Sequence, residues 1–493
     1  MVKSKIDKNL KILGQLQQAT QGQNQTQLNI GFSILFLIAI FAISSSLTDG
    51  ITGAHYIIAA AVIGGYMAMN IGANDVANNI GPAVGSRALT MTGALLIAAV
   101  FEAAGAIIAG GDVISTISKG IIDPSFISNP TIFITAMMAA LLAAALWLNL
   151  ATWLGAPVST THSIVGGVMG AGIAAAGMNA VNWPQMGAIA SSWIISPVLG
   201  ALIAALFLYF IKHSILYKDD RIEAARKWVP VLVGIMVGAF AMYLSLKGLK
   251  RIWHPSASMV WLIGFIGFTI TYFSSRPLVL KASVGMDNRK KEVNKLFTIP
   301  LIGSAALLSF AHGANDVANA IAPLSAIVST VTEGEIAAKV HIPMWVMLVG
   351  ALGISFGLML FGPKLIRTVG EKITRLDQVR AFCVALSAAI TVIAASWMGL
   401  PVSSTHIAVG GVFGVGFLRE FLANKKRKQK GIDWSDTSSL DKKQMKKMIK
   451  SEKRRLVRRN YLTSIAAAWV ITVPLAALLS GSLFMLMISI QDN

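Results

Sequence analysis

Charged residues are scarce in this chain of 493 residues. Asp, Glu, Lys and Arg together make up 13% of it, whereas hydrophobic residues make up 55% and the mean hydropathy is +0.67. A soluble domain has about 25% charged residues, so the composition excludes an ordinary soluble fold. Many apolar runs reach the ~20 residues that cross a bilayer. We therefore expect an all-α polytopic membrane protein.

Cysteine is nearly absent as well. The single cysteine, Cys383, excludes a framework of internal disulfides, and its apolar surroundings predict a small buried side chain rather than a reactive thiol. No small-residue cleavage site follows the first apolar run, which begins near residue 31. We therefore expect a retained first span instead of a cleaved signal peptide.

Acidic residues are the rarer charge, with 22 Asp and Glu against 42 Lys and Arg, which gives a formal net charge of +20. More than half of this excess lies in the segment 419–459, which holds sixteen Lys or Arg and five Asp or Glu. One basic loop between apolar segments is typical of a cytoplasmic loop that touches anionic lipid headgroups, and it argues against a nucleic-acid partner. The loop charges predict a cell (inner) membrane protein with its N-terminus in the cytoplasm and its C-terminus outside.

The apolar segments predict about 12–13 spans. The first half begins outside in this topology and the second half begins inside, so the two halves form inverted repeats. The predicted divisions are a cytoplasmic N-terminal tail at 1–30, an extra span at 31–54, a first repeat at 55–217, connecting spans and a basic loop at 218–295, and a second repeat at 296–493.

The polar motif GANDVAN occurs twice, at 72–78 and at 313–319, each time inside a long apolar stretch. Ionisable residues within a membrane are functional by default, because their burial is costly. Gly and Asn are poor helix formers, so we expect broken helices that unwind or kink at both motifs and offer carbonyls to a cation. The candidate cation ligands are Asp75, Asp316, Asn78, Asn319 and Glu102.

A second duplicated motif follows each GANDVAN copy, as PVSTTH at 157–162 and PVSSTH at 401–406. Proline at a helix start followed by hydroxyls concentrates donors where backbone N–H groups are free, which suits a tetrahedral oxyanion. Ordinary N-capping is the alternative. These segments could cross the membrane or re-enter it. The candidate oxyanion ligands are Ser159, Thr160, Thr161, Ser403, Ser404 and Thr405.

Four further ionisable residues stand within the apolar segments. Glu102 lies in the middle of a predicted span, and its approximate counterpart in the second half is Gly353, so the site is not fully symmetric. We expect three histidines to be hydrogen-bonded polar side chains that orient their neighbours. Proton transfer or metal binding is the alternative. The three histidines are His162, His312 and His406.

The charge balance of the two motifs predicts symport. Asp75 and Asp316 would repel an oxyanion, and the predicted spans hold little Lys or Arg to offset them. A mobile cation between carboxylate and anion resolves this conflict. It would bind cooperatively with the anion, because each lowers the desolvation cost of the other.

The paired GANDVAN and PVS-[ST]-TH motifs resemble those of the inorganic phosphate transporter (PiT) family, over about residues 55–490. The resemblance implies a secondary transporter that moves phosphate with Na⁺ or H⁺, is built from inverted repeats, forms a homodimer and needs no cofactor beyond the coupling ion. It also implies that Asn74, Asn315 and the two aspartates belong to the ion and phosphate sites, and that the six hydroxyls bind phosphate.

The chain departs from the family pattern at Ala385, where eukaryotic sodium-coupled members tend to carry a glutamate. Its central loop, 275–295, is short, which resembles prokaryotic members. Some of these carry sulfate or metal-bound phosphate, so an H⁺-coupled metal-phosphate or sulfate permease is the alternative. We favour Na⁺ over H⁺, because Asn74 and Asn315 offer hard neutral oxygens beside the aspartates.

Two other classes of protein were considered. An intramembrane hydrolase would use Ser159 or Ser403 as nucleophile, with a nearby histidine as base. Duplication argues against it, because hydrolysis needs one such pair and not two, and we expect no enzyme. A passive anion channel would favour basic rings instead of the two aspartates.

Overall fold

The computed structural model describes residues 5–491, except for residues 128, 155, 157, 249–254, 337–339, 373–375 and 429–458. For residues 5–24 it describes the backbone alone. Within these residues the chain is helical almost throughout, and strand pairing is limited to an isolated bridge between Ile122 and Val181. The prediction of an all-α fold is confirmed. Most of the basic loop 419–459 lies outside the described residues, as does Pro157 of the first PVS motif.

The helices run in this order: α1 (Lys5–Leu47), α2 (Ala54–Gly85), α3 (Met91–Ala109), α4 (Gly111–Ser115), η1 (Thr116–Gly120), η2 (Pro124–Phe126), α5 (Pro130–Leu154), α6 (Thr160–Ala176), η3 (Met178–Ala180), α7 (Trp183–Ile211), η4 (Lys212–Leu216), α8 (Arg221–Lys247), α9 (Ala257–Ala282), α10 (Lys290–Leu296), α11 (Thr298–Glu333), α12 (Met344–Lys372), α13 (Gln378–Trp397), α14 (Ser404–Lys428) and α16 (Arg459–Gln491).

Most of these helices are suited to a bilayer. Among the described residues, eleven helices are long and apolar enough to cross a membrane, and the pair α10–α11, bent by 46°, gives a twelfth. The helix α6, with 17 residues, is shorter than a full span. The protein is therefore a multi-pass membrane protein, with a span count at the lower end of the predicted range.

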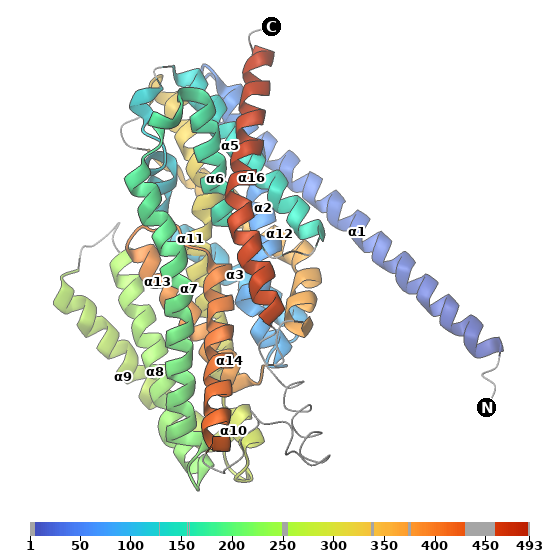
Figure 1. The fold of residues 1–493 in the computed structure, drawn as a ribbon, viewed down its shortest axis with the longest axis vertical. Coiled ribbons are helices and arrows are strands. Elements are labelled where there is room, and N and C mark those ends of the chain that lie inside the picture. The colour runs from blue at the N-terminus through green and yellow to red at the C-terminus, as the bar shows by residue number, and fades with distance from the viewer. Residues whose placement is uncertain are drawn as a thin grey trace.

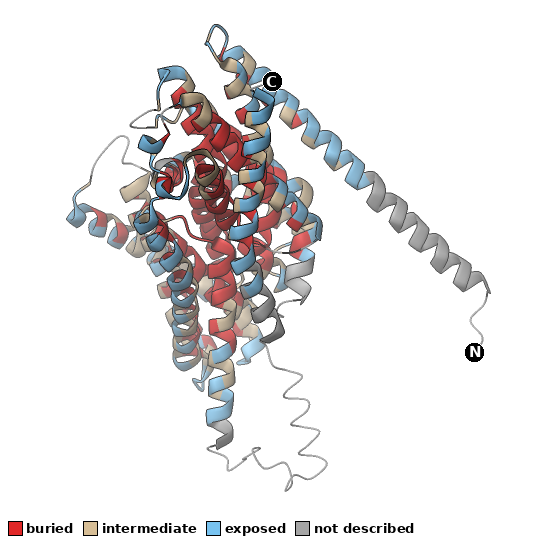
Figure 2. Ribbon diagram, turned by 45° about the horizontal axis from the view of Figure 1, so that its top comes forward, coloured by how far each residue is buried: buried red, intermediate tan, exposed pale blue. Residues whose placement is uncertain are grey.

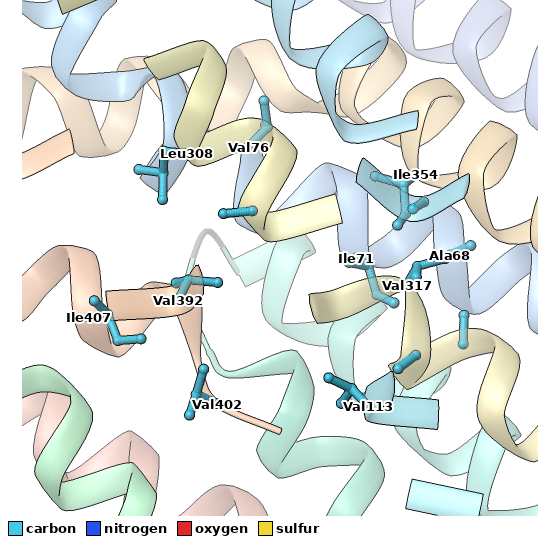
Figure 3. Packing of buried hydrophobic residues seen from close by; sticks show 14 of the residues in the cluster. Ala68, Ile71, Val76, Val113, Leu308, Val317, Ile354, Val392, Val402 and Ile407 are labelled. Carbon is cyan, nitrogen blue, oxygen red and sulfur yellow. The ribbon is translucent and has the colours of Figure 1, made fainter. Parts of the chain in front are cut away.

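Both GANDVAN motifs lie within uninterrupted α-helices, α2 and α11, so the prediction that the chain unwinds there is wrong. The amides here bond to side chains of facing helices and not to their own backbone, as when Asn78 of the motif donates to Thr405 at 2.8 Å and the following Asn79 donates to Glu102 at 2.8 Å. The helical backbone consequently has no competitor for its hydrogen bonds. Figure 3 shows Val76, from the first motif, among the buried side chains of this core.

The helices α5 and α6 form a hairpin that enters and returns at one end of the bundle. Its outer ends are tied together, because the N–H of Asp123 donates to the carbonyl of Ala180 at 2.8 Å and that of Asn182 to Ile121 at 3.0 Å. The tip between the two helices lies deep in the bundle, beside the middle of α2 and α11. The described part of the first PVS motif therefore lies at the tip of this hairpin.

The helices α13 and α14 form a second hairpin, with the PVSSTH motif at its tip. It approaches the centre from the end opposite to that of α5 and α6, and α14 runs back toward that end beside α7 (Figure 1). The two hairpin tips thus meet in the interior. A hairpin that re-enters the membrane leaves the sidedness of the later spans as it would be if both of its helices crossed.

The two halves exchange packing partners. The helix α2 packs on α12, and α11 packs on α3. A Cβ atom added to Gly72 would lie 2.0 Å from the carbonyl oxygen of Ile354, and one added to Gly313 would lie 2.0 Å from that of Glu102. Glycine is therefore needed where these backbones touch. The matching contacts make Ile354 the counterpart of Glu102, one residue beyond the predicted Gly353.

Two of the described helices, α1 and α9, lie at the edge of the bundle. Figure 2 shows the buried residues concentrated in its interior, whereas α1 extends away from it. The helix α1 is continuous from Lys5 to Leu47, so the predicted tail and the predicted extra span share one helix. The helix α9 packs mainly on α8 and exposes most of its surface, including Trp261 and Phe265. Such apolar faces suit lipid contact.

Candidate functional site

The two hairpin tips place two helix N-termini at the centre of the protein. The side chain of Ser159 accepts a hydrogen bond from the backbone N–H of His162 at 3.1 Å, and that of Ser403 accepts one from His406 at 3.3 Å. Each serine is therefore an N-cap, as the capping alternative predicted. Free N–H groups and the helix dipole make such ends favourable for anions.

Hydroxyl groups of both tips bond to the two motif aspartates. Oδ2 of Asp316 accepts from Ser404 at 3.1 Å and from Thr160 at 3.4 Å. Oδ1 of Asp75 accepts from Thr405 at 2.9 Å. The predicted oxyanion ligands and the predicted cation ligands thus form one buried cluster.

The amides at the end of each motif face the hairpin of the other half. Asn78 donates to Thr405 at 2.8 Å, while Asn319 donates to Thr161 at 3.2 Å and to Thr160 at 3.3 Å. Thr161 in turn donates to the carbonyl of Val402 in the second tip at 3.0 Å. Each half of the chain therefore completes the polar site of the other.

Asn74 and Asn315 fasten each motif to the hairpin of its own half. With its amide nitrogen toward the acceptors, Asn74 donates to Asp75 at 3.2 Å and to Val158 O at 3.1 Å, and its oxygen accepts from Thr152. Asn315 makes the matching bonds to Asp316 and Val402 O, and accepts from Ser396. The amide oxygens are thus already engaged by hydroxyls.

Sequence reasoning missed these two hydroxyl partners. Thr152 and Ser396 lie at equal distances before the two PVS motifs, so their duplication was a signal that could have found them. They orient the asparagines, which in turn hold the aspartates.

His312 joins three carboxylates. Its Nε2 atom lies 2.9 Å from Oδ2 of Asp316 and 3.6 Å from Oδ2 of Asp75, and its Nδ1 atom lies 3.1 Å from Oε2 of Glu102. Asn79 donates to the other oxygen of Glu102 at 2.8 Å. Glu102 therefore reaches the aspartates only through the imidazole, so the sequence found this carboxylate but not its connection.

The centre carries a strong negative charge without a Lys or Arg partner among these contacts. Asp75, Glu102, His312 and Asp316 are fully buried. Ligand atoms of Asp75, His312 and Asp316 lie within 4.8 Å of one another, close enough to share a metal ion. Buried charges are normally paired or bound to a cation, so this arrangement favours cation binding.

The two other histidines lie beside the tips, and their rings contact each other at a tilt of 33°. The ring centroids of His162 and His406 are 4.5 Å apart, and Trp193 covers His162 at 3.8 Å. The adjacent serine hydroxyls accept backbone N–H groups, as described above, and each thus serves as a helix cap. The arrangement serves packing between the hairpins and does not favour a serine nucleophile.

Known proteins are similar to this chain in sequence and in fold. Residues 71–480 match the model of the phosphate transporter family. A relative named "Putative phosphate permease", from Helicobacter pylori strain J99, is 46% identical over 95% of this chain and 97% of its own length. One with the same description from Thermococcus kodakarensis is 37% identical over 86% and 95%.

A solved structure agrees with these relatives. It is described as the sodium-dependent phosphate transporter, has a TM-score of 0.77 and 35% identity, and covers 88% of this chain and 99% of its own. The family and these relatives are transporters and not enzymes. The duplicated motifs, the two opposed hairpins and these matches together place the chain in the phosphate transporter family.

Proposed function

We propose that the protein is a secondary active symporter that imports inorganic phosphate together with a cation, Na⁺ in preference to H⁺, by alternating access. The observation that carries this proposal is the set of hydrogen bonds from Thr160, Ser404 and Thr405 to the carboxylates of Asp75 and Asp316. Groups suited to an anion and groups suited to a cation share one buried site, and two helix N-termini lie at it.

Phosphate binding is assigned to the two hairpin tips. The hydroxyls of a tip are short donors on a helix N-terminus, where backbone N–H groups and the dipole also favour an anion. When phosphate takes these donors, the aspartates lose them. The assigned phosphate ligands are Ser159, Thr160, Thr161, Ser403, Ser404 and Thr405, with Asn74 and Asn315 holding the tips in place.

This exchange of donors couples phosphate to a cation. A carboxylate that gives up a hydroxyl in a dry interior needs another positive partner, because an unpaired buried charge is costly. A cation beside Asp75 or Asp316 supplies that partner and attracts the incoming anion. Asn78 and Asn319 lie beside the two carboxylates and their hydroxyl partners, and Glu102 acts on them through the imidazole of His312.

Na⁺ is the preferred coupling ion because oxygen atoms dominate the site and because the solved relative is described as sodium-dependent. His312 favours a second candidate, an H⁺-coupled metal-phosphate or sulfate permease. Imidazole carries protons near neutral pH and is a good ligand for transition metals, which Na⁺ does not require.

Inverted repeats and alternating access are supported by the exchanged partners of the two halves. The helices α2, α3, α5, α6 and α7 correspond in order to α11, α12, α13, α14 and α16. Because the two hairpins enter from opposite ends, a rocking motion that loosens one hairpin opens the centre toward one side of the membrane. We assign the end of the bundle that carries α10 and the C-terminal end of α14 to the cytoplasmic side of the inner membrane. We also propose that the protein is a homodimer surrounded by lipid.

The decisive test is uptake of radiolabelled phosphate into proteoliposomes. An inward Na⁺ gradient at equal pH should drive accumulation, and sulfate should not compete. Uptake driven by a proton gradient in sodium-free medium would favour the second candidate, as would competition by sulfate or a requirement for a divalent metal. Phosphate uptake that does not depend on any ion gradient would contradict symport.

A further inference from the structure

A second group of cations lies far from the central site, at the end of the bundle that carries α10. Lys212 is the first residue of η4, at the end of α7. Arg380 stands in the first turn of α13, and Arg419 lies toward the end of α14. The helix α7 packs against both α13 and α14, and the charges of Arg380 and Arg419 act on Lys212. We call Lys212, Arg380 and Arg419 the basic cluster.

The charge of this cluster is only partly balanced. Oδ2 of Asp377 lies 2.7 Å from Nη2 of Arg380, and the same carboxylate caps α13 by accepting from the backbone N–H of Arg380 at 3.0 Å. Among the described residues whose charges act on Lys212, three are cations, Arg380, Arg419 and Lys290, and one is a carboxylate, Asp377, so positive charge is in excess. The side chain of Arg380 is 16% exposed, and Lys212 and Arg419 are half-buried. Like charges at partly buried positions repel more strongly than in water.

One atom of the cluster has no partner among the residues that the structure describes. Nη1 of Arg380 is buried and makes no hydrogen bond to any of them. A buried donor without an acceptor costs free energy, more so when it is charged. The positive-inside preference explains basic residues at this end, but it does not explain a guanidinium donor turned away from water. An acceptor on a bound anionic ligand would satisfy it.

We propose that the basic cluster binds the phosphate group of an anionic ligand, at a site separate from the transport site. The planar guanidinium of Arg380 suits the tetrahedral oxyanion in two-point contact, while Arg419 and Lys212 supply further positive charge. The ligand is either the headgroup of an anionic phospholipid or free inorganic phosphate.

The position of the cluster suits both sources. Tyr217, 55% exposed, follows the last turn of the span that carries Lys212, and Lys290 lies 5.8 Å from the centre of its ring. Tyrosine at the end of a span is typical of headgroup depth. Because the cluster joins α7 to the base of the α13–α14 hairpin, its ligand would brace the hairpin whose tip carries Ser403, Ser404 and Thr405.

The test compares the wild-type protein with the variant Arg380→Gln/Arg419→Gln in two arms. In the lipid arm, the protein is placed in nanodiscs of phosphatidylcholine with a small fraction of phosphatidylglycerol, and the retained lipid is measured by native mass spectrometry. In the phosphate arm, inorganic phosphate is titrated into the protein in pure phosphatidylcholine nanodiscs. We expect a tenfold or greater loss of affinity in one arm, which identifies the source, with the central phosphate site retained.

The matched control is Lys281→Gln/Lys291→Gln, which removes two exposed cations near the same end without touching the cluster. It should behave as the wild type in both arms. The single variant Arg419→Gln keeps the ion pair between Arg380 and Asp377 and serves as the test if the double variant unfolds. Equal binding of phosphatidylglycerol and of inorganic phosphate by wild type and the folded variant would overturn the proposal.

Discussion

His312 lies one helical turn before Asp316 and is 2.9 Å from it through Nε2, whereas the matching position before Asp75 is occupied by Ile71. The duplicated site is therefore not symmetric in charge. Asp316 is held by the imidazole and by hydroxyls of both tips, while Oδ2 of Asp75 makes no hydrogen bond. This oxygen, 3.6 Å from Nε2 of His312, is the carboxylate oxygen that we expect to be more available to the proposed cation.

Replacing either aspartate by asparagine should abolish most coupled uptake while leaving the fold intact. Asp75→Asn and Asp316→Asn keep the shape of the side chain but remove the charge that attracts the cation. Hydrogen bonds to charged groups contribute about 1.5–3 kcal/mol, so phosphate uptake should fall by roughly 10–150-fold. The exposed Asp123→Asn is the control. Near-normal gradient-driven uptake by either folded variant would contradict the assignment.

Loss of a tip hydroxyl should weaken phosphate binding more than it destabilises the protein. Thr405→Ala removes the donor to Asp75 and the acceptor for Asn78, and Thr161→Ala removes a matching group from the first tip. We expect the Kd for phosphate to rise by about tenfold or more in calorimetric titration. Thr391→Ala is the control, because that hydroxyl is buried but bonds within its own helix. Unchanged phosphate affinity in both variants would make the hydroxyls simple caps.

The glycines at the helix crossings should tolerate no side chain. In Gly72→Ala and Gly313→Ala the new Cβ atom would lie 2.0 Å from a backbone carbonyl oxygen of the facing helix. Overpacking of this kind costs about 1–3 kcal/mol, so the Tm of purified protein should fall. Gly81→Ala, with nothing within 4 Å of the added atom, should leave the Tm nearly unchanged. Equal Tm values for all three would show that the helices can separate freely.

Coupling should appear as reciprocal binding. If Na⁺ shares the site, Na⁺ should raise the affinity for phosphate, and phosphate should raise the affinity for Na⁺ by the same factor, in the range of about 5–150-fold. Titrations of each ligand at fixed levels of the other measure both factors. Asp316→Asn should bring them close to one. Phosphate affinity indifferent to Na⁺ but dependent on pH would assign the coupling to H⁺.

The sidedness of the bundle can be read by cysteine labelling. In a Cys383→Ser background, Lys425→Cys marks the end of α14 and Asp49→Cys marks the connection from α1 to α2, both at exposed positions. We expect an impermeant maleimide to label Asp49→Cys in intact cells and to label Lys425→Cys only after permeabilisation. The reverse pattern would invert the proposed topology.

The sequence predicted which residues gather at the candidate site better than it predicted how they are arranged. The duplicated Asp75 and Asp316 and the tip hydroxyls could be found because polar residues stand out in apolar segments and recur at a fixed separation. The sequence could not show that α2 stays helical. Its Asn residues have low helix propensity, but in the fold they bond to partners such as Thr405, and only the fold brings these partners near.

Connections between distant residues were also beyond sequence reasoning. Glu102 was recognised as a buried carboxylate, but nothing in its neighbourhood reveals that His312 stands between it and the aspartates. The contacts between the motif of one half and the hairpin of the other could not be predicted either. A pattern of spans gives the order of the helices and not which of them touch. Thr152 and Ser396 were missed because single hydroxyls in apolar helices are common.

The bonds from Asn78 to Thr405 and from Asn319 to Thr161 have a consequence for how the chain could have arisen. Neither half contains a complete set of partners, so a half-length ancestor could have worked only as a pair of copies inserted in opposite orientations. Gene fusion would then have fixed their pairing and let one copy acquire His312. Two separately expressed fragments, divided within the segment 249–254, should accordingly regain phosphate binding only when they are produced together.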